Sequence, residues 1–432
     1  MAYHHLEQTF GRAVKIGPFT ATTQTEGAVW PAATILVDAA LGDDSPWNPG
    51  TTTPLKTLAE VLKRLPISLV GANGYVTVQF AAGDYTIPST GLEADFAGSV
   101  NFVGAWGAPT ATFTVDSYSG DDCHVHQPAG NPAWTVDEWA GYWVEVPWPG
   151  YPDYPSRAPI LANGTHDLTI GIPSANPWGP GSVGTVAKIL KPSVRFLGGG
   201  TISILSGSLY VDSVMFDKDP GGSWSFFYQL NPSTLQFGNC HFRCANSGGA
   251  AGYASSPGAI TYVYNCFIEN GYSVFYAYDS VVEFDGVSLL NSLRLVEGRQ
   301  CLAFNWNAVN ARNSNDIFFL HYRSWAVDRG GLYQMINMMG GGWEGTVWFL
   351  NYTDAMLLAG GKALDGKTPG KWVDLNGFGR CRLQGTWADT IDPTKAIAIR
   401  GPAGTVWMSI ADLIGPYGGD YDYGYGLGVT KA

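Results

Sequence analysis

The feature of this sequence that most constrains its fold is a repeat of short apolar segments that end on the same small polar corner. The corners fall at Asp212, Asn239, Asn265 and Asp285, and a weaker copy begins at Asn307. Successive corners are 27, 26, 20 and 22 residues apart. A loose period of this size indicates a solenoid whose coils differ in loop length.

The residues after each corner follow a common order: a small residue, then an apolar residue two positions later in three of the copies. Because strand side chains alternate between two faces, we predict that these two positions point inward and that the intervening position points outward. Asp and Asn suit the corner because they tolerate a left-handed backbone, and their side chains can bond to one another when coils stack about 4.8 Å apart. The predicted inward set is Ser213, Met215, Cys240, Phe242, Cys266, Ile268 and Gly286, and the outward set is Val214, His241, Phe267 and Val287.

The composition agrees with a chain of tight turns and buried strands. The sequence has 56 Gly and 26 Pro, only 14% charged residues, and almost no long helical periods. A β-sandwich with turn Asn residues at similar intervals is the alternative to a solenoid.

One amphipathic helix is predicted directly before the solenoid, after a strand at 34–38. Thr53 suits the N-cap and Pro54 the first helical position. Leu55, Leu58, Leu62 and Leu65 then form an apolar stripe that ends at Pro66. A helix over 54–65 in this place covers the open strand edges of the first coil.

The succession ILVDAALGDDSPWNPGTTTPLKTLAEVLKRLP followed by GYVTVQFAAGDYTI resembles the opening of phage tail-spike and related pectate-lyase-like proteins. The resemblance covers residues 34–87 and includes a Val-Asp strand, a Gly-Asp loop, a helix and a first coil closing on Gly-x-Tyr. It implies a right-handed parallel β-helix in a homotrimeric spike on a virus particle. It supplies no catalytic residue.

We therefore expect an all-β chain in three parts. Residues 1–33 form a leader that attaches to other virion proteins, residues 34–320 form the parallel β-helix with its capping helix, and residues 321–432 form a β-rich region that can trimerise. The Gly/Tyr-rich tail at 417–426 either pairs with sister chains or is a free tip.

An insertion is expected at 121–185, because the segment 128–180 has ten Pro and five Trp, which a regular coil would not tolerate. Part of it is similar to a small β-module of phage structural proteins. Aromatic rings in such loops can stack on the apolar faces of sugars. Packing between protomers, or a small core of the insertion itself, would use the same residues. The carbohydrate-binding candidates are Trp134, Trp139, Trp143, Trp148, Tyr151, Tyr154 and Trp178.

No catalytic motif is present, and whether the chain is an enzyme stays open. Sugar hydrolysis would need two carboxylates about 5–9.5 Å apart in one groove. Glu269, Glu283 and Asp285 are the candidates, because neighbouring coils can bring them within reach. Solvation of an ordinary outer surface explains the same residues, and the clustered Asp, His and basic motifs of pectate lyases and polygalacturonases are missing.

We expect no metal and no cofactor. His124-x-His126 puts two imidazoles on one strand face near Asp121 and Asp122, which is also the pattern of a polar turn with surface histidines. Cys240, His241 and Cys244 lack paired CxxC spacing, and stacked Cys240 and Cys266 are expected as reduced packing residues inside the solenoid.

The net charge of −12 argues against nucleic acid and anionic membranes as partners. No apolar run is long enough for membrane insertion, and residues 1–30 carry no secretion signal, so the chain either stays in the cell or leaves it in a lysis-released particle. These observations favour a virion spike or fibre subunit, a homotrimer on the tail or head surface, that adheres to a bacterial surface glycan. The alternatives are a polysaccharide depolymerase (hydrolase or lyase) on the same β-helix, and a structural decoration or adaptor protein of the particle.

Overall fold

The computed structural model describes most of the chain between residue 33 and residue 431. The described residues are 15–16, 19–20, 33–45, 48, 50–65, 75–119, 124–148, 151–171, 183–218, 225–244, 250–254, 256–307, 309–328, 332–336, 346–357, 360–364, 371–376, 379–383, 397–400, 404–408, 419–421 and 429–431.

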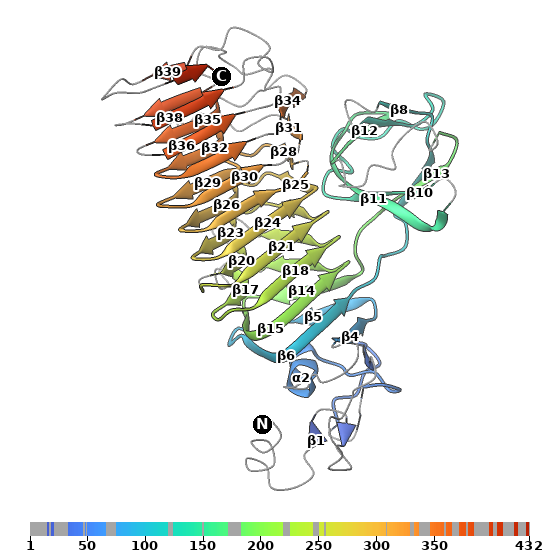
Figure 1. The fold of residues 1–432 in the computed structure, drawn as a ribbon. Coiled ribbons are helices and arrows are strands. Elements are labelled where there is room, and N and C mark those ends of the chain that lie inside the picture. The colour runs from blue at the N-terminus through green and yellow to red at the C-terminus, as the bar shows by residue number, and fades with distance from the viewer. Residues whose placement is uncertain are drawn as a thin grey trace.

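The chain winds as a parallel β-helix whose coils present three faces, here called sheets I, II and III (Figure 1). Sheet I has nine strands, each parallel to the next. They are β5 (Gly83–Thr86), β14 (Val194–Gly198), β16 (Met215–Lys218), β19 (His241–Cys244), β22 (Phe267–Glu269), β25 (Val287–Leu290), β28 (Val309–Arg312), β31 (Leu332–Ile336) and β34 (Gly360–Leu364).

Sheets II and III are also parallel ladders, and the long strands β6 (Leu92–Val103) and β15 (Ile202–Asp212) contribute to both. The other strands of sheet II are β17 (Ser225–Gln229), β20 (Ala250–Ala254), β23 (Ser273–Tyr278), β26 (Arg294–Arg299), β29 (Phe318–His321), β32 (Thr346–Asn351), β35 (Lys371–Asn376), β37 (Ile397–Arg400) and β39 (Gly419–Tyr421). Those of sheet III are β3 (Ala33–Val37), β4 (Tyr75–Phe80), β18 (Thr234–Gly238), β21 (Ile260–Tyr264), β24 (Val281–Asp285), β27 (Leu302–Asn305), β30 (Trp325–Asp328), β33 (Asp354–Leu357), β36 (Gly379–Leu383), β38 (Gly404–Met408) and β40 (Val429–Lys431).

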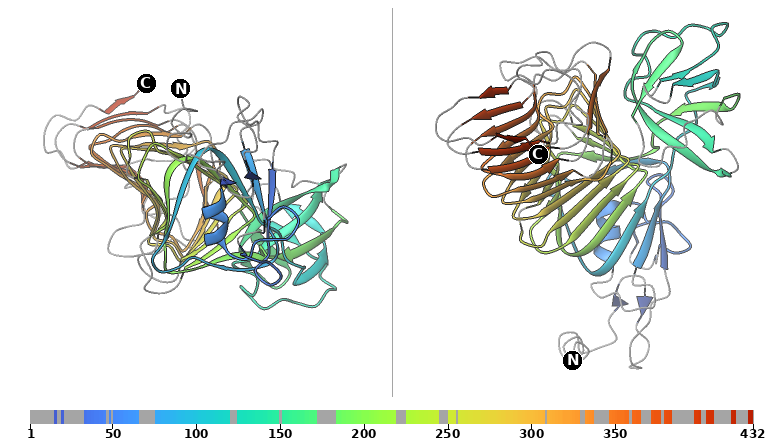
Figure 2. Two further views of the ribbon diagram at one scale, coloured as in Figure 1. Left: turned by 90° about the horizontal axis from the view of Figure 1, so that it is seen from below. Right: turned by 45° about the horizontal axis from the view of Figure 1, so that its top comes forward.

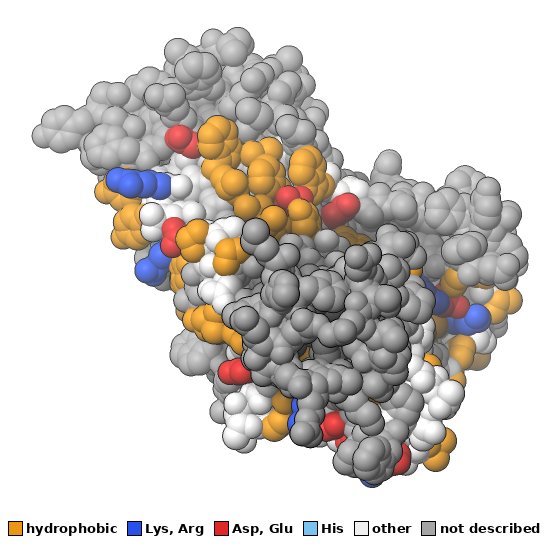
Figure 3. Space-filling view, turned by 60° about the horizontal axis from the view of Figure 1, so that its bottom comes forward, with side chains coloured by type: hydrophobic (Ala, Val, Ile, Leu, Met, Phe, Trp, Pro, Cys, Tyr) orange, Lys and Arg blue, Asp and Glu red, His pale blue; other side chains and the backbone are white. Residues whose placement is uncertain are grey.

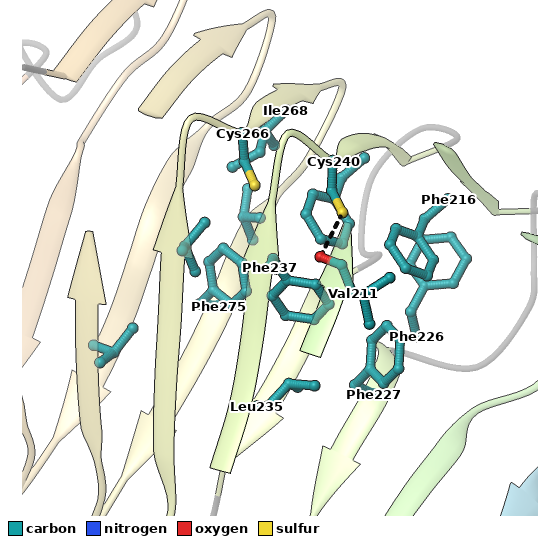
Figure 4. Packing of buried hydrophobic residues seen from close by; sticks show 14 of the residues in the cluster. Val211, Phe216, Phe226, Phe227, Leu235, Phe237, Cys240, Cys266, Ile268 and Phe275 are labelled. Atoms are coloured by element: carbon teal, nitrogen blue, oxygen red, sulfur yellow. Dashed lines mark hydrogen bonds between the residues drawn. The ribbon is translucent and has the colours of Figure 1, made fainter. Parts of the chain in front are cut away.

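The space enclosed by the three sheets is filled by aromatic and aliphatic side chains (Figure 4). Phe216 and Phe242, on neighbouring coils of sheet I, stack with ring centroids 4.8 Å apart, and Phe237 of sheet III meets Phe242 edge to face at 5.0 Å. Cys240 and Cys266 lie in this core as unpaired thiols, and the Cys240 Sγ contacts the Val211 carbonyl at 3.3 Å. The sequence prediction of a right-handed parallel β-helix is confirmed.

The corner between sheets III and I repeats the same backbone conformation on successive coils. Ser213, Asn239, Asn265 and Gly286 have φ values of 57°, 51°, 45° and 65°, the left-handed region that Gly and Asn adopt most readily. Asn265 Nδ2 donates to Asn239 Oδ1 at 2.6 Å, and Asn239 Nδ2 donates to Asp212 Oδ1 at 2.8 Å. The predicted column of bonded corner side chains is therefore present over these three coils.

Two of the four predicted corners are displaced by one residue. The left-handed positions are Ser213 and Gly286, and not Asp212 and Asp285. A one-residue shift sends each following side chain to the other face. Val214 and Val287 therefore lie in the core, whereas Met215 and Ser288 stand in register with outward-facing His241 and Phe267. The expected inward position of Met215 and the expected outward positions of Val214 and Val287 were wrong.

The helix is shorter than predicted. Helix α2 spans Leu58–Arg64, and its N-cap is Thr57, whose side chain accepts from the Glu60 N–H at 3.2 Å. The expected start at Thr53 and Pro54 was wrong because Leu55 pairs with Val37 of β3 through its backbone. Leu58 and Val61 of the helix, and Leu65 at its C-cap, join the core of the first coils. Figure 2 shows the helix across the lower end of the solenoid.

The insertion is an antiparallel sheet between β6 and β14, beside the solenoid (Figures 1 and 2). It starts earlier than the predicted 121–185, because the strand at Ala111–Thr114 belongs to it and pairs with β13. Trp106 and Pro192 close its neck with a backbone bridge. Its strands are β7 (Ala111–Thr114), β8 (Ser117–Ser119), β9 (His124–His126), β10 (Trp143–Trp148), β11 (Tyr151–Asn163), β12 (Asp167–Ile170) and β13 (Val186–Leu190).

The described strands after residue 320 continue the coils of sheets I, II and III, so no change of architecture marks the expected boundary at 320. Of the Gly/Tyr-rich tail, β39 pairs with β37, and the rest lies outside the described residues. In the leader, β1 (Lys15–Ile16) and β2 (Phe19–Thr20) form a small antiparallel pair, and the other leader residues lie outside the described part. Within the described residues, no helix has the length and apolar character needed to cross a membrane.

Candidate functional site

On the outer face of sheet III, apolar side chains at β27 and β30 are exposed to solvent. In β27, Ala303 and Asn305 point into the solenoid and are buried, so Leu302 and Phe304 point outward, as does Trp306 directly after the strand. Leu302 is 40% exposed and Trp306 39% exposed. Trp325, in register with Leu302 on the next coil, is 48% exposed. We call Leu302, Phe304, Trp306 and Trp325 the aromatic row.

The two neighbouring rings of the aromatic row stack on each other. The ring planes of Phe304 and Trp306 are 6° from parallel, with ring centroids 5.7 Å apart. The Trp306 Nε1–H donates to Glu283 Oε2 at 2.7 Å, which fixes the ring orientation from the neighbouring coil. Figure 3 shows exposed hydrophobic side chains gathered on one face of the molecule with acidic side chains between them. An ordered, exposed apolar surface beside polar groups is typical of a ligand-binding surface.

Two of the three predicted carboxylates border this row. Val282 and Phe284 of β24 are buried in the core, so Glu283 and Asp285 share the outward face, about 6.6 Å apart along the strand. Glu283 lies in register between Tyr262 and Phe304. Burial raises the pKa of Tyr262, and the neighbouring Glu283 carboxylate raises it further. Burial also raises the pKa of Asp285, against a hydrogen bond from Asn307.

Charges of both signs lie near Leu302 and Trp325. Arg299 and Arg323 are both exposed, and they precede Leu302 and Trp325 at the corner between sheets II and III. Arg299 lies over the Tyr278 ring at 5.5 Å. The exposed Asp354 is in register with Trp325 on the next coil.

Glu269, the third predicted carboxylate, lies on sheet I and does not belong to this site. It is 8% exposed, and a Cβ on Gly141 of the insertion would lie only 3.0 Å from its Oε2. Its Oε1 is 3.2 Å from Nε2 of the fully buried His241. Burial would raise the pKa of Glu269, but His241, Lys191 and Arg243 outweigh burial and hold the pKa below its usual range. Glu269 is a structural partner at the junction with the insertion.

The insertion packs on the outer face of sheet I through apolar and charged contacts. Trp143, Leu161 and Leu190 of the insertion form one cluster with Phe267 and Leu290 of the solenoid. Next to this cluster, the Arg312 guanidinium binds both carboxylate oxygens of Asp137, at 2.8 and 2.7 Å, and the Leu161 carbonyl.

Burial divides the predicted sugar-binding aromatics of the insertion. Trp143 is fully buried at the junction, and Trp139 is 8% exposed in the core of the insertion. Trp134 is partly buried against that core, with its ring 5.2 Å from Phe113. In this conformation the buried rings of Trp143 and Trp139 cannot stack on a sugar. Trp148, Tyr151 and Tyr154 lie in the β10–β11 hairpin and Trp178 follows β12, and all four side chains fall outside the described part.

One metal pattern of the sequence does not come together. Cys240 and Cys244 point into the core, whereas His241 between them points outward, so the three cannot share an ion. His124 and His126 share one face of β9, with ring centroids 6.2 Å apart, and His124 Nδ1 is 3.6 Å from Asp167 Oδ2. Asp121 and Asp122 lie outside the described residues. The described residues contain no group of three or more His, Cys, Asp or Glu side chains arranged to hold a metal.

The aromatic row was not predicted, although its sequence contains the signal. In Leu302-Ala303-Phe304-Asn305-Trp306 the large side chains alternate with small or polar ones. If the corner Asn307 is aligned with Asp285, the outward-facing Glu283 pairs with Asn305, whereas in the structure Glu283 pairs with Phe304. This alignment error of one residue assigns the side chains of the aromatic row to the core, so the sequence does not predict the row as a surface feature.

Comparison with known proteins gives the following. No protein-family model and no curated protein matches this chain. Among solved structures, it is similar to a GH136 lacto-N-biosidase from Eubacterium ramulus, with 10% identity over 93% of this chain and 67% of the other and a TM-score of 0.37. It is also similar to the tailspike gp49 of Pseudomonas phage LKA1 (11% identity, 79% and 69% covered, TM-score 0.24) and to the gp54 tailspike of Acinetobacter baumannii phage AP22, solved with a capsular saccharide (8% identity, 81% and 70% covered, TM-score 0.18).

Proposed function

We propose that this chain is a subunit of a virion spike that binds a polysaccharide of the bacterial surface, and that the aromatic row makes the contact. In this proposal the chain forms a homotrimer and residues 1–33 attach it to other virion proteins. The observation that carries the proposal is the exposed Trp306 ring, which stacks parallel to Phe304 and is held by a hydrogen bond to Glu283 on the neighbouring coil.

The arrangement of these rings fits a sugar-binding surface better than it fits ordinary solvent-exposed side chains. An isolated surface aromatic is normal, but two stacked rings, one of them fixed by a hydrogen bond, offer an ordered apolar surface that loses little side-chain entropy on binding. The neighbouring Glu283 carboxylate accepts hydrogen bonds, as sugar hydroxyls require. The coils below and above hold this surface on strands, which position a site more precisely than loops do.

The test is binding of the full-length protein to purified bacterial surface polysaccharides. Trp306→Ala should weaken binding about ten-fold, which corresponds to about 1.4 kcal/mol of stacking and desolvation. Tyr75→Ala is the matched control, because Tyr75 is a 38% exposed aromatic at the other end of the same sheet. Equal binding by Trp306→Ala and the wild type would refute the proposed role of the row. A change in sedimentation caused by Trp306→Ala would instead favour a structural role of these rings between protomers.

A depolymerase is the second candidate, favoured by the shared outward face of Glu283 and Asp285. Hydrolysis with inversion requires two carboxyl groups about 6.5–9.5 Å apart, and adjacent outward positions of a strand fall near this range. Release of reducing ends from a bound polysaccharide, lost in both Glu283→Gln and Asp285→Asn, would support it. Binding without any release of reducing ends would leave adhesion as the function.

A further inference from the structure

The outer face of sheet III continues from the aromatic row across the neighbouring coils. Strand register aligns the outward positions of successive coils in columns that run parallel to the solenoid axis, and Figure 1 shows β15, β18, β21 and β24 stacked in this order. The middle column, from β15 to β27, consists of Tyr210, Gln236, Tyr262, Glu283 and Phe304. The column on the side of sheet I consists of Asp212, Gly238, Tyr264 and Asp285, followed by Trp306 after β27.

The third outward column, on the side of sheet II, has a different chemistry. It consists of Ser208, Thr234, Ile260, Val281, Leu302 and Trp325. Among these described positions a ring occurs only at Trp325, and none carries a carboxylate or an amide. The first two columns combine rings with carboxylates and an amide, which together can contact the apolar faces and the hydroxyls of sugars. We call the first two columns, from β15 to Trp306, the sheet III strip.

The sheet III strip has ordered rings at both ends. At the end away from Trp306, the rings of Tyr210 and Tyr264 stack with centroids 6.0 Å apart and planes 10° from parallel. The Tyr264 hydroxyl donates to the Tyr210 hydroxyl, which donates to Asp212 Oδ1 at 3.2 Å. Tyr262, partly exposed, lies between the two ends and in register with Glu283. Side chains held in this way lose little entropy when a ligand binds.

The spacing of the coils matches the spacing of sugars in an extended glycan. Neighbouring coils lie about 4.8 Å apart, and each pyranose lengthens a glycan by about 5 Å, so a glycan parallel to the solenoid axis meets about one coil per sugar. From Tyr210 to Phe304 the strip crosses four coil intervals, or about 19 Å. A glycan lying along β27 would instead leave the strip beyond Phe304, at the aliphatic Leu302.

We infer that the bound glycan lies across the coils, parallel to the solenoid axis, from Trp306 toward the Tyr210 and Tyr264 rings. Tyr262 and Gln236 then contact sugars of the same chain and are specificity-determining residues of the site. An extended stretch of about four sugars fills the sheet III strip. This inference rests on the proposed function and adds to it the direction of the ligand and two contact residues.

The experiment measures binding of the full-length protein to the purified bacterial surface polysaccharide that the wild type binds, and to fragments of increasing length prepared from it by partial hydrolysis. Tyr262→Ala should weaken binding of the polymer about ten-fold, and Gln236→Ala about five-fold. The matched controls are Ile260→Ala and Thr234→Ala, which change the third column on the same two strands and should bind like the wild type.

Fragment length separates a sugar contact from a structural role of Tyr262. Wild-type affinity should rise with each added sugar up to about four, whereas in Tyr262→Ala the rise should stop after about two, because the third sugar reaches the coil of Tyr262. An equal loss for fragments of every length, or wild-type binding by both Tyr262→Ala and Gln236→Ala, would overturn the inference and leave the proposed function standing. Binding that is absent for all polysaccharides, or unchanged in Trp306→Ala, would refute the proposed function itself.

Discussion

At the scale of single residues, the corner column ends on side-chain acceptors whose hydrogen bonds are not all made. Asp212, Asn239 and Asn265 bond in one direction, each amide donating to the side chain on the coil before it. At the end of the column, Asn265 Oδ1 and Asp285 Oδ1 are both buried acceptors without a donor among the described residues. A buried acceptor that lacks a donor costs about 1–3 kcal/mol.

This leads to a prediction for Asp285→Asn. Because burial raises the folded-state pKa of Asp285, ionisation destabilises the wild-type fold. The destabilisation begins as pH rises above the unfolded-state pKa of about 3.9 and is complete above the raised folded-state pKa. Asp285→Asn cannot ionise, so its free energy of unfolding should exceed that of the wild type by about 1 kcal/mol at pH 7 and approach it at low pH.

Urea unfolding at several pH values measures this difference. Asp212→Asn is the control, since Asp212 accepts hydrogen bonds from Asn239, Tyr210 and Ser213 and an amide would lose part of them. It should destabilise the protein at neutral pH. A lower stability of Asp285→Asn at pH 7 would contradict the assignment of Asp285 as a destabilising charge.

At the scale of elements, close approach between neighbouring strands restricts the residue at Gly238. A Cβ on Gly238 would lie 2.6 Å from the Tyr264 ring, which reaches across it so that its hydroxyl can bond to the Tyr210 hydroxyl. We predict that Gly238→Ala displaces Tyr264 and lowers the free energy of unfolding by about 1–3 kcal/mol. Gly130→Ala is the control because no atom lies within 4 Å of the added Cβ. Similar stabilities of the two variants in denaturant unfolding would show that the Tyr264 ring adapts freely.

The attachment of the insertion to sheet I gives another prediction at this scale. Arg312 bridges β28 to Asp137 and to the Leu161 carbonyl, and its side chain is only 13% exposed. In Arg312→Ala, amide hydrogens of 137–163 should exchange about ten-fold faster, since charge-assisted bonds between the two elements are lost. Arg312→Lys keeps the charge but not the two-oxygen contact and should show an intermediate rate. Unchanged exchange in Arg312→Ala would mean that the apolar cluster around Trp143 alone holds the insertion.

Sequence patterns predict these elements well where the backbone preference of a single residue determines the structure. They predict them poorly where the pairing register between distant strands determines it. Asn239 and Asn265 were placed correctly because their own backbone preference selects the corner. Asp212 and Asp285 were misplaced because Ser213 and Gly286 take the left-handed position, and the Asp beside each mimics a corner residue. The helix start was misplaced because pairing of Leu55 with Val37 is a contact with a distant strand, which no local signal encodes.

At the scale of the whole molecule, the same register errors explain why the fold was predictable and the candidate site was not. A shift of one residue leaves the period of the coils intact, so the solenoid is still recognised. In the sequence-based alignment, however, the same shift exchanges inward and outward positions. Trp306 and Phe304 are then assigned to the core, although they lie on the surface. The insertion was recognised from its composition, but its rings at Trp139 and Trp143 pack internally, which composition cannot show.

The last prediction concerns whether folding and glycan binding of the solenoid require the insertion. The backbone bridge between Trp106 and Pro192 brings the two ends of the insertion together, so a short Gly-Ser linker can replace residues 107–191. The excision uncovers Phe267 and Leu290, so Phe267→Ser and Leu290→Thr accompany it to avoid an exposed apolar patch. Because each coil contacts mainly its neighbours, the shortened chain should keep its parallel β-helix and its Trp306-dependent glycan binding. Circular dichroism tests whether the shortened chain is folded, and the binding assay tests whether it still binds the glycan. A folded variant that no longer binds would place the glycan contact on the insertion and not on the aromatic row.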